Sequence, residues 1–435
     1  MSFPIKKLTK TIRASFLTLP LVFAANGISA AESLDDRIQK LENLVKELKQ
    51  AKGTKKSSGK HTYKFGGFIK ATAQFSDYSD GDLGANSGLR DFYIPSVIPV
   101  KGPGVEGESQ DFDFSAKESR INFKSTHVLD NGSTLTTFIE MDFLLPPGGN
   151  ERVSNSYNPR LRHAFFKYDN WLFGQTWSTF QDVGALPESA DFLGASEGII
   201  FERQPMVRYT KGSFQIALEN PESTIANIPG EKPGRIVTDD NSTPDLVLRY
   251  NHKANWGHIS FAGLVRQLEY NNKYDGNGNL IDKFEESTSA FGVSVTGKFK
   301  VGAKDDIRFN FATGSGLGRY AGLNLFKGAV IVVDGDGNVA GLETIDSTHA
   351  SVAYRHFWNN TWRSNFIYST AAADNDTNLT GTNAIESTSS FQVNLLVSPA
   401  PKVTLGVGYL SAIKTLENNN EGELGRLIFT AKYAF

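Results

Sequence analysis

The amino-acid sequence predicts an all-β fold, a transmembrane antiparallel β-barrel of about 16 strands preceded by a short N-terminal coiled-coil helix. Three observations predict this fold class. The C-terminal segment alternates in polarity, long and short connections alternate along the chain, and the N-terminal segment has the pattern of an export signal. The composition agrees, because only 39% of the residues are hydrophobic, as expected when one face of each strand lines water.

The C-terminal segment has the alternation of a strand with one apolar face. That face carries the series Leu427, Phe429, Ala431, Tyr433 and Phe435. Strands that cross a membrane place alternate residues against lipid and carry aromatic girdles at the interfaces. The final Phe435 resembles the C-terminal signal of bacterial outer-membrane barrels, so we expect the barrel assembly machinery to bind it. The same alternation also occurs in soluble edge strands.

Residues 1–30 have the pattern of a secretory signal peptide. Basic residues precede the apolar run 14–25, and small residues follow at Ser29, Ala30 and Ala31. We expect cleavage after Ala30 or Ala31. The apolar run is too short to span a bilayer, and no later run of about 18 apolar residues predicts a transmembrane helix. An exported chain without such a helix is integral if it closes a barrel, since closure pairs its backbone amides and carbonyls.

Residues 31–51 predict a short periplasmic coiled-coil helix. The apolar residues at heptad a and d spacing are Leu34, Ile38, Leu41, Val45 and Leu48. β-branched residues at a with leucine at d favour two strands, and an amphipathic helix packed on its own barrel is the alternative interpretation. Residues 52–61 contain lysine, glycine and serine and predict a flexible linker. Residues 62–435 predict the barrel.

Alternating segments of about ten residues, separated by turn-rich stretches, predict the strands of the barrel. The expected strands are 62–76, 117–128, 132–144, 160–168, 171–177, 205–210, 213–219, 245–253, 256–270, 287–300, 305–315, 348–357, 361–371, 387–398, 402–413 and 424–435. The long connections are 77–116, 145–159, 178–204, 220–244, 271–286, 316–347, 372–386 and 414–423, and short ones alternate with them. Long extracellular loops and short periplasmic turns are typical of such barrels and place both termini in the periplasm.

Charged residues fall on the strand faces that oppose the apolar ones. In the expected strand 305–315, Arg308 opposes Ile307 and Phe309. A midplane arginine on the lipid face costs roughly 2–4 kcal/mol, so we expect these side chains to point into water, inside a barrel wide enough for an aqueous channel. The expected channel-lining, substrate-binding arginines are Arg120, Arg160, Arg162, Arg203, Arg208, Arg249, Arg266, Arg308, Arg355 and Arg363.

Carboxylates on the same inner faces are few, mainly Glu140 and Asp142. Arginines that face a channel raise the local concentration of anions, and a guanidinium suits a carboxylate because it bonds both oxygens. The sequence therefore predicts a channel for small anions. In the alternative interpretation the arginines pair with neighbouring side chains or bind lipopolysaccharide at the rim, and Arg203, expected in a loop, fits either.

The composition excludes several classes of protein. The chain has no cysteine, which excludes a disulfide framework and a thiolate metal site. A net charge of -2 without a basic helix argues against nucleic-acid binding. The seven histidines show no ligand spacing, so we expect no metal and no cofactor. No combination of nucleophile, histidine and acid predicts an enzyme.

The segments KFGGFIKATAQFSDY (64–78), SRINFKS (119–125), TTFIEMDF (136–143), RLRHAFFKYDNWLFGQTWSTF (160–180) and LIFTAKYAF (427–435) stand out. They resemble the DcaP-like trimeric porins of Gram-negative bacteria, over nearly the whole mature chain. The resemblance implies a homotrimer in the outer membrane that takes up small anionic solutes, such as dicarboxylates, by passive diffusion. By analogy with porins, we expect the third long connection, 178–204, to fold inward as a constriction loop that carries Glu188 and Asp191. The alternative is a solvated external loop.

Three other functions stay open from the sequence. An outer-membrane barrel enzyme of the lipase or protease type would need a serine beside a histidine, and Ser260 with His258 is one such pair. A general, non-selective porin would share the fold. An adhesin or phage receptor would use the long loops and is compatible with a porin.

Overall fold

The structure is a computed structural model that describes residues 39, 42–43, 61–102, 104–105, 107–145, 149–150, 154–231, 234–238, 240–274 and 280–435. The expected signal peptide (1–30) lies outside the described residues, as do the expected coiled-coil helix (31–51) and linker (52–61) apart from isolated positions. The chain divides into two units, Met1–Ser58 and Gly59–Phe435. The fold concerns the second unit.

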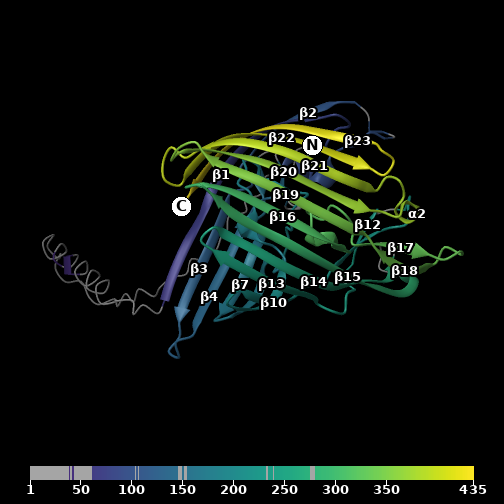
Figure 1. Ribbon diagram of the computed structural model, residues 1–435, viewed down its shortest axis with the longest axis horizontal. Helices are drawn as coiled ribbons and strands as arrows, with labels where there is room; N and C mark the ends of the chain where they lie inside the picture. Colours follow the sequence, from purple (N-terminus) through teal and green to yellow (C-terminus); the bar gives the residue numbers. More distant parts are fainter. Residues whose placement is uncertain are drawn as a thin grey trace, which may run out of the picture. The chain divides into compact units, whose positions relative to one another are not determined.

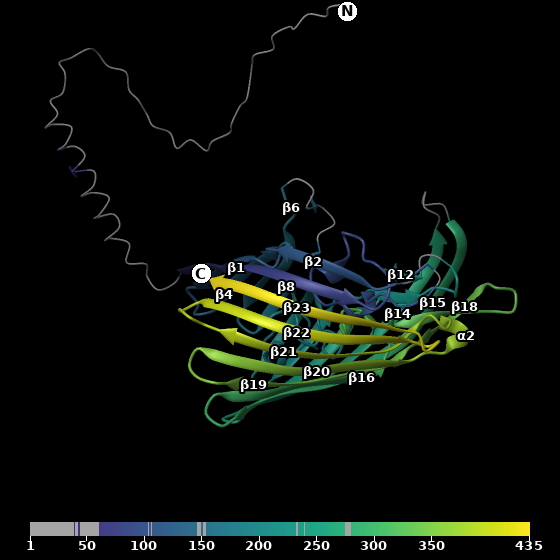
Figure 2. The ribbon, with the colours of Figure 1, turned by 90° about the horizontal axis from the view of Figure 1, so that it is seen from above.

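Antiparallel strands of this unit form a closed barrel (Figures 1 and 2). The 16 strands of its wall are β1 (His61–Tyr78), β3 (Arg120–Val128), β4 (Thr134–Asp142), β7 (Arg160–Tyr168), β8 (Trp171–Trp177), β9 (Arg203–Lys211), β10 (Phe214–Glu219), β13 (Asp245–Ala254), β14 (Gly257–Tyr274), β15 (Leu280–Val301), β16 (Asp305–Ser315), β19 (Asp346–Phe357), β20 (Trp362–Asp374), β21 (Ile385–Val397), β22 (Val403–Leu416) and β23 (Glu421–Ala434). Each wall strand pairs with the next, and β23 pairs with β1, which closes the barrel. Closure removes the free strand edges that a membrane does not tolerate.

The predicted fold class is confirmed, and many strand bounds agree. The bounds of β7, β8 and β16 coincide with the expected 160–168, 171–177 and 305–315. Several expected loops contain strand instead. β14 and β15 extend into 271–286 as a long hairpin, and β2 (Ser109–Ser115) forms within 77–116 and pairs with β1. The extension of β14 and β15 is rich in polar residues, so it lacks the apolar alternation that marks a membrane-spanning strand. β2 does alternate, because Phe112 and Phe114 are exposed whereas Asp113 between them is buried.

The long connections add structure of their own. They contribute a four-stranded sheet with the order β12 (Arg235–Thr238), β11 (Ser223–Ala226), β17 (Ala329–Val333) and β18 (Val339–Thr344). Figure 1 shows β17, β18 and α2 (Thr377–Thr380) at the end of the barrel opposite the C-terminus. The remaining short elements are η1 (Gly88–Arg90), η2 (Pro95–Val97), β5 (Gly149–Asn150), β6 (Ser156–Tyr157), η3 (Val183–Ala185) and η4 (Gly318–Tyr320). Within the described ranges, no helix is long and apolar enough to cross a membrane.

The wall has an apolar outer face and a polar inner face. In β21, Phe391 and Leu395 are exposed on the outside, whereas Gln392 and Asn394 are buried against the contents of the barrel. This alternation is the expected division between lipid and lumen.

Tryptophans mark the short-turn end of the outer surface. Trp171, Trp256, Trp358 and Trp362 lie in or beside the short turns, and each exposes between 41% and 59% of its surface. Because aromatic rings gather at membrane interfaces, these residues mark one boundary of the lipid-facing band.

The seam where β1 meets β3 and the C-terminus requires a glycine. Gly67 has a φ of +153°, and a Cβ there would lie 2.0 Å from the Arg120 carbonyl oxygen and 3.0 Å from the Phe435 ring. The backbone N–H of Phe435 donates to the Gly67 carbonyl at 3.1 Å. The strands therefore meet closely at a position that has no room for a side chain.

Replacing Gly67 with alanine should weaken this seam, because the new Cβ pushes the backbones of β1 and β3 apart. We expect Gly67→Ala to cost roughly 1–3 kcal/mol of barrel stability. Gly263→Ala is the matched control, since a Cβ there meets nothing within 4 Å. The temperature at which the unboiled barrel shifts its mobility in SDS gels measures the difference. Identical transition temperatures for the two variants would contradict this role of Gly67.

Candidate functional site

The third loop (residues 178–202), which connects β8 and β9, lies against the inner face of the wall. Side chains from three separate strands donate hydrogen bonds to its backbone carbonyls: Asn310 to Ala185 at 3.3 Å, Asn394 to Glu188 at 3.1 Å and Lys70 to Ala190 at 3.1 Å. These donors belong to β16, β21 and β1. The loop therefore runs through the interior of the barrel and is fixed there by its backbone.

The loop approaches the wall so closely that one position requires glycine. A Cβ on Gly198 would lie 2.1 Å from the Ala350 carbonyl oxygen. The N–H of Gly198 also donates to the Ser369 hydroxyl at 2.9 Å. Only glycine fits where two backbone segments approach each other this closely.

The Arg363 cluster joins the third loop to three adjacent strands and consists of Arg308, Arg355, Arg363, Asp306 and Glu188. Arg363 holds both oxygens of Glu188, with Nε–Oε2 at 2.8 Å and Nη2–Oε1 at 2.5 Å. Arg355 Nη1 lies 3.4 Å from Glu188 Oε2, and its Nη2 bonds Asp306. Arg308 Nε donates to Asp306 at 2.8 Å. Glu188 is thus shared by two arginines.

The charge of Glu188 is stabilised by these partners. Burial alone would raise the pKa of Glu188, but the hydrogen bond and positive charge of Arg363, followed by those of Arg355, outweigh burial and hold the pKa below its usual range. Glu188 is therefore a carboxylate at neutral pH.

The Arg160 cluster lies across β3, β4, β7 and the start of β9, and consists of Arg120, Arg160, Arg162, Arg203, Glu140 and Asp142. Arg160 makes two bonds of 2.9 Å to Asp142. Arg162 reaches both carboxylates, at 2.9 Å and 2.7 Å, and Arg120 lies 3.6 Å from Glu140. Among the described residues Arg203 has no carboxylate partner, and its guanidinium carbon lies 4.5 Å from the centre of the Trp177 ring.

Arg160 and Arg203 line a cavity of about 500 Å³. Phe92, Phe192 and Phe201 line the same cavity, with ring centres 4.8 Å apart for Phe92 and Phe192 and 5.9 Å apart for Phe192 and Phe201. The cavity therefore offers guanidinium groups beside aromatic faces. Glu202 and Glu222 also line it.

Other expected arginines are less accessible. Arg249 pairs with Asp182 of the third loop at 3.1 Å, and Arg266 pairs with Asp245 at 3.4 Å. The side chains of Arg162 and Arg266 are only 2% and 1% exposed. They offer little surface to a solute, so their contacts support the wall and its loops.

Carboxylates near the arginines are more numerous than the expected Glu140 and Asp142. The further ion-pair partners are Asp182, Glu188, Asp245 and Asp306. Of the expected arginines only Arg203 and Arg208 lack a carboxylate partner within the part of the chain that the structure describes. Asp306 stands two residues before Arg308 on the same strand face, so the strand alternation could have predicted that they are neighbours. The carboxylates of the third loop lie outside any strand, so no alternation predicts their arginine partners.

Asp191 and Arg203, two residues expected in the third long connection, lie in different surroundings from Glu188. Asp191 is 3% exposed and accepts the backbone N–H of Tyr93 at 3.0 Å, so it joins the first and third loops and does not face open solvent. Burial raises the pKa of Asp191. Arg203, expected in a loop, is the first residue of β9. Arg319, which pairs with Glu222 at 3.0 Å, lies in a loop without periodicity and was missed.

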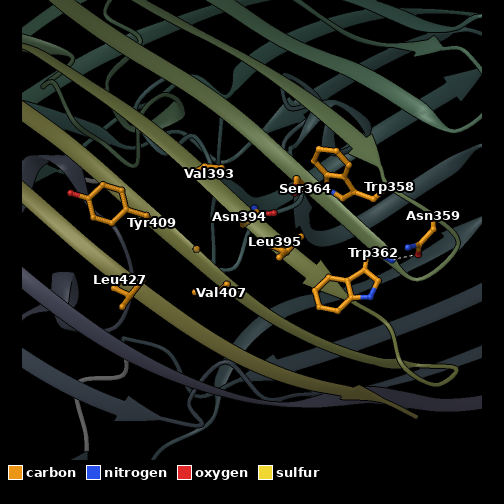
Figure 3. A pocket seen from close by; sticks show the side chains of 11 residues that line it. Trp358, Asn359, Trp362, Ser364, Val393, Asn394, Leu395, Val407, Tyr409 and Leu427 are labelled. Carbon is orange, nitrogen blue, oxygen red and sulfur yellow. Dashed lines mark hydrogen bonds between the residues drawn. The ribbon is translucent and has the colours of Figure 1, made fainter.

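A second hollow lies on the outer face of β20–β23 (Figure 3). It is a groove of about 570 Å³ whose lining includes Trp358, Trp362, Leu395, Val407 and Tyr409. These residues belong to the apolar face of the wall, so the groove faces the membrane and is separate from the polar interior.

A closed barrel with an apolar, tryptophan-marked outer face and a charged interior occupied by a loop defines an outer-membrane porin. The sequence profile of the DcaP outer membrane protein family matches residues 45–435, and the chain belongs to this family. The resemblance predicted from the sequence is thereby confirmed.

Solved structures have the same fold. The outer membrane channel DcaP of Acinetobacter baumannii matches with a TM-score of 0.66 and 22% identity, over 87% of this chain and 99% of that chain. The trimer form of OmpT of Vibrio cholerae matches with a TM-score of 0.51 and 12% identity, over 86% and 100% of the two chains. OmpF of Salmonella typhi in complex with daunomycin has a TM-score of 0.51 and 10% identity, over 86% and 97%. A comparison with curated proteins found no match.

The close packing of Gly198 gives a test of the loop position. Gly198→Ala should displace the loop from the wall, because its Cβ would lie 2.1 Å from a backbone oxygen, and the single-channel conductance should rise as the interior empties. Gly84→Ala, in the first loop, is the control, since a Cβ there meets nothing within 4 Å. A conductance equal to that of the control would show that the loop does not restrict the channel.

Proposed function

We propose that the protein is a passive channel for small anionic solutes, in particular organic acids of the dicarboxylate type. The observation that carries the proposal is the excess of guanidinium groups over carboxylates in the Arg160 cluster and the Arg363 cluster inside the barrel. The Arg160 cluster has four arginines and two carboxylates, a formal charge of +2 (4 − 2). Cationic rings in a pore favour anions, and arginine suits carboxylates because of its planar fork.

The Arg363 cluster supports the same proposal. Its three arginines and two carboxylates leave a formal charge of +1 (3 − 2). A solute that passes through the barrel would meet the two clusters on different parts of the wall, and both carry a positive excess. A general, non-selective porin is the second candidate, and the many ion pairs favour it because each one lowers the free positive charge.

An enzymatic function has little support in this geometry. The Ser260 hydroxyl accepts a hydrogen bond from Arg249 Nε at 2.7 Å, and His258 Nε2 lies 2.8 Å from Asp182 Oδ2. Among the described residues no hydrogen bond joins Ser260 to His258, so the pair lacks the contact that would activate a nucleophile. We therefore propose that the protein is not an enzyme.

We propose a homotrimer in the outer membrane. β8 has seven residues and β10 has six, fewer than the about 9–11 that a strand needs to cross the hydrocarbon. A neighbouring subunit would cover this low side of the wall. The solved OmpT described as a trimer has the same fold.

The expected export and assembly steps remain part of the proposal. The signal peptide would be removed, and the N-terminal helix would lie in the periplasm. Phe435, which is 38% exposed, would be recognised by the barrel assembly machinery. Lipopolysaccharide and other outer-membrane lipids would surround the apolar band.

Neutralising two interior arginines tests the anion preference. Arg308→Gln combined with Arg355→Gln should lower the chloride-to-potassium permeability ratio by about twofold or more, because two positive charges leave the lumen. Reversal potentials in a salt gradient across planar bilayers measure the ratio. The control combines Lys211→Gln with Lys253→Gln, which removes two charges at exposed positions of short-turn strand ends. Equal ratios for both double variants would contradict the proposal.

A further inference from the structure

We infer that Arg363 Nε and Nη2 form a binding site, here called the seat, for the carboxylate of a permeating solute. The Glu188 carboxylate occupies the seat in the absence of solute, and Glu188 thereby acts as an internal competitor. The inference rests on the proposed anion channel and names a residue that sets its affinity. Glu188 would keep solute binding weak enough for rapid release.

The seat has the geometry of a carboxylate-binding site. Arg363 presents Nε and Nη2 to the two oxygens of Glu188, at 2.8 Å and 2.5 Å, which is the bidentate arrangement that arginine often makes with carboxylates. Arg355 adds a third donor at 3.4 Å. A free carboxylate on a small solute would satisfy the same donors.

The seat is reachable from water. The side chain of Glu188 is 26% exposed, that of Arg355 is 22% exposed and that of Arg363 is 11% exposed. Arg355 Nε is itself buried and has no hydrogen-bond partner among the described residues, so it is an unused donor next to the site. Arg363 pairs with Phe357 in the ladder beside the short β19–β20 turn, so the seat lies in the short-turn half of the barrel.

Exchange of one carboxylate for another explains why an occupied seat is useful in a channel. The same charge-assisted hydrogen bonds exist before and after the exchange, so a solute gains little net free energy from Arg363. Conduction requires binding that is favourable enough for entry and weak enough for exit. Without Glu188 the cluster would hold three arginines and one carboxylate, and a dicarboxylate would stay longer.

The third loop does not depend on the Glu188 side chain for its position. The Glu188 carbonyl accepts from Asn394 at 3.1 Å, and the Ser189 hydroxyl donates to Gln392 at 3.2 Å. The Leu186 carbonyl also accepts from Arg308. An isosteric change of the carboxylate to an amide should therefore leave the loop in place.

Succinate blockage of single channels tests the inference, with Glu188→Gln as the variant and Asp182→Asn as its matched control. Asp182 lies in the same loop and pairs with Arg249 at 3.1 Å, so both variants remove one carboxylate charge from the loop. We expect Glu188→Gln to lengthen the succinate residence time by about tenfold, as expected for the loss of a charged competitor. Asp182→Asn should change it much less.

A variant that removes the seat supplies an independent test. Arg363→Gln should shorten the succinate residence time, and Glu188→Gln should add nothing in the Arg363→Gln background. Residence times that are equal in Glu188→Gln and Asp182→Asn, or an undiminished Glu188→Gln effect without Arg363, would overturn the inference while the anion channel stands. A wild-type channel that prefers potassium over chloride would instead overturn the proposed function.

Discussion

Every backbone amide and carbonyl in a membrane-spanning wall has to find its partner inside the sheet, because hydrocarbon offers none. The pairing of β23 with β1 meets this constraint by closing the sheet. Closure then determines which side chains face lipid and which face the interior, since alternate residues of each strand point to opposite faces. Apolar residues such as Phe391 remain exposed to lipid, and the guanidinium groups have only the interior left to them.

A closed wall of this circumference would leave a wide lumen, and the third loop occupies part of it. Glycine permits the contact at Gly198, and side-chain donors such as Asn394 hold the loop backbone. The loop also brings carboxylates to arginines of the wall, most clearly in the pair of Glu188 with Arg363. The third loop therefore both narrows the lumen and lowers its positive charge.

Much of the fold was predictable because strand periodicity is a local property of the sequence. The expected strand 305–315 coincides with β16, and Arg308 falls on the polar face there. The polar hairpin extension near Tyr274 was not predictable, since a strand beyond the membrane needs no apolar face. The ion pair of Asp182 with Arg249 was also hidden, because a loop residue finds its partner through tertiary packing that periodicity does not encode. Asp306 was the exception, since it shares a strand face with Arg308.

The central claim is that the interior of the barrel favours negatively charged solutes. The sign of the reversal potential of the wild-type channel in a potassium chloride gradient tests this claim most directly. The account predicts a reversal potential shifted from zero toward the chloride equilibrium potential, because arginines outnumber carboxylates in both clusters. A reversal potential shifted toward the potassium equilibrium potential would contradict the account.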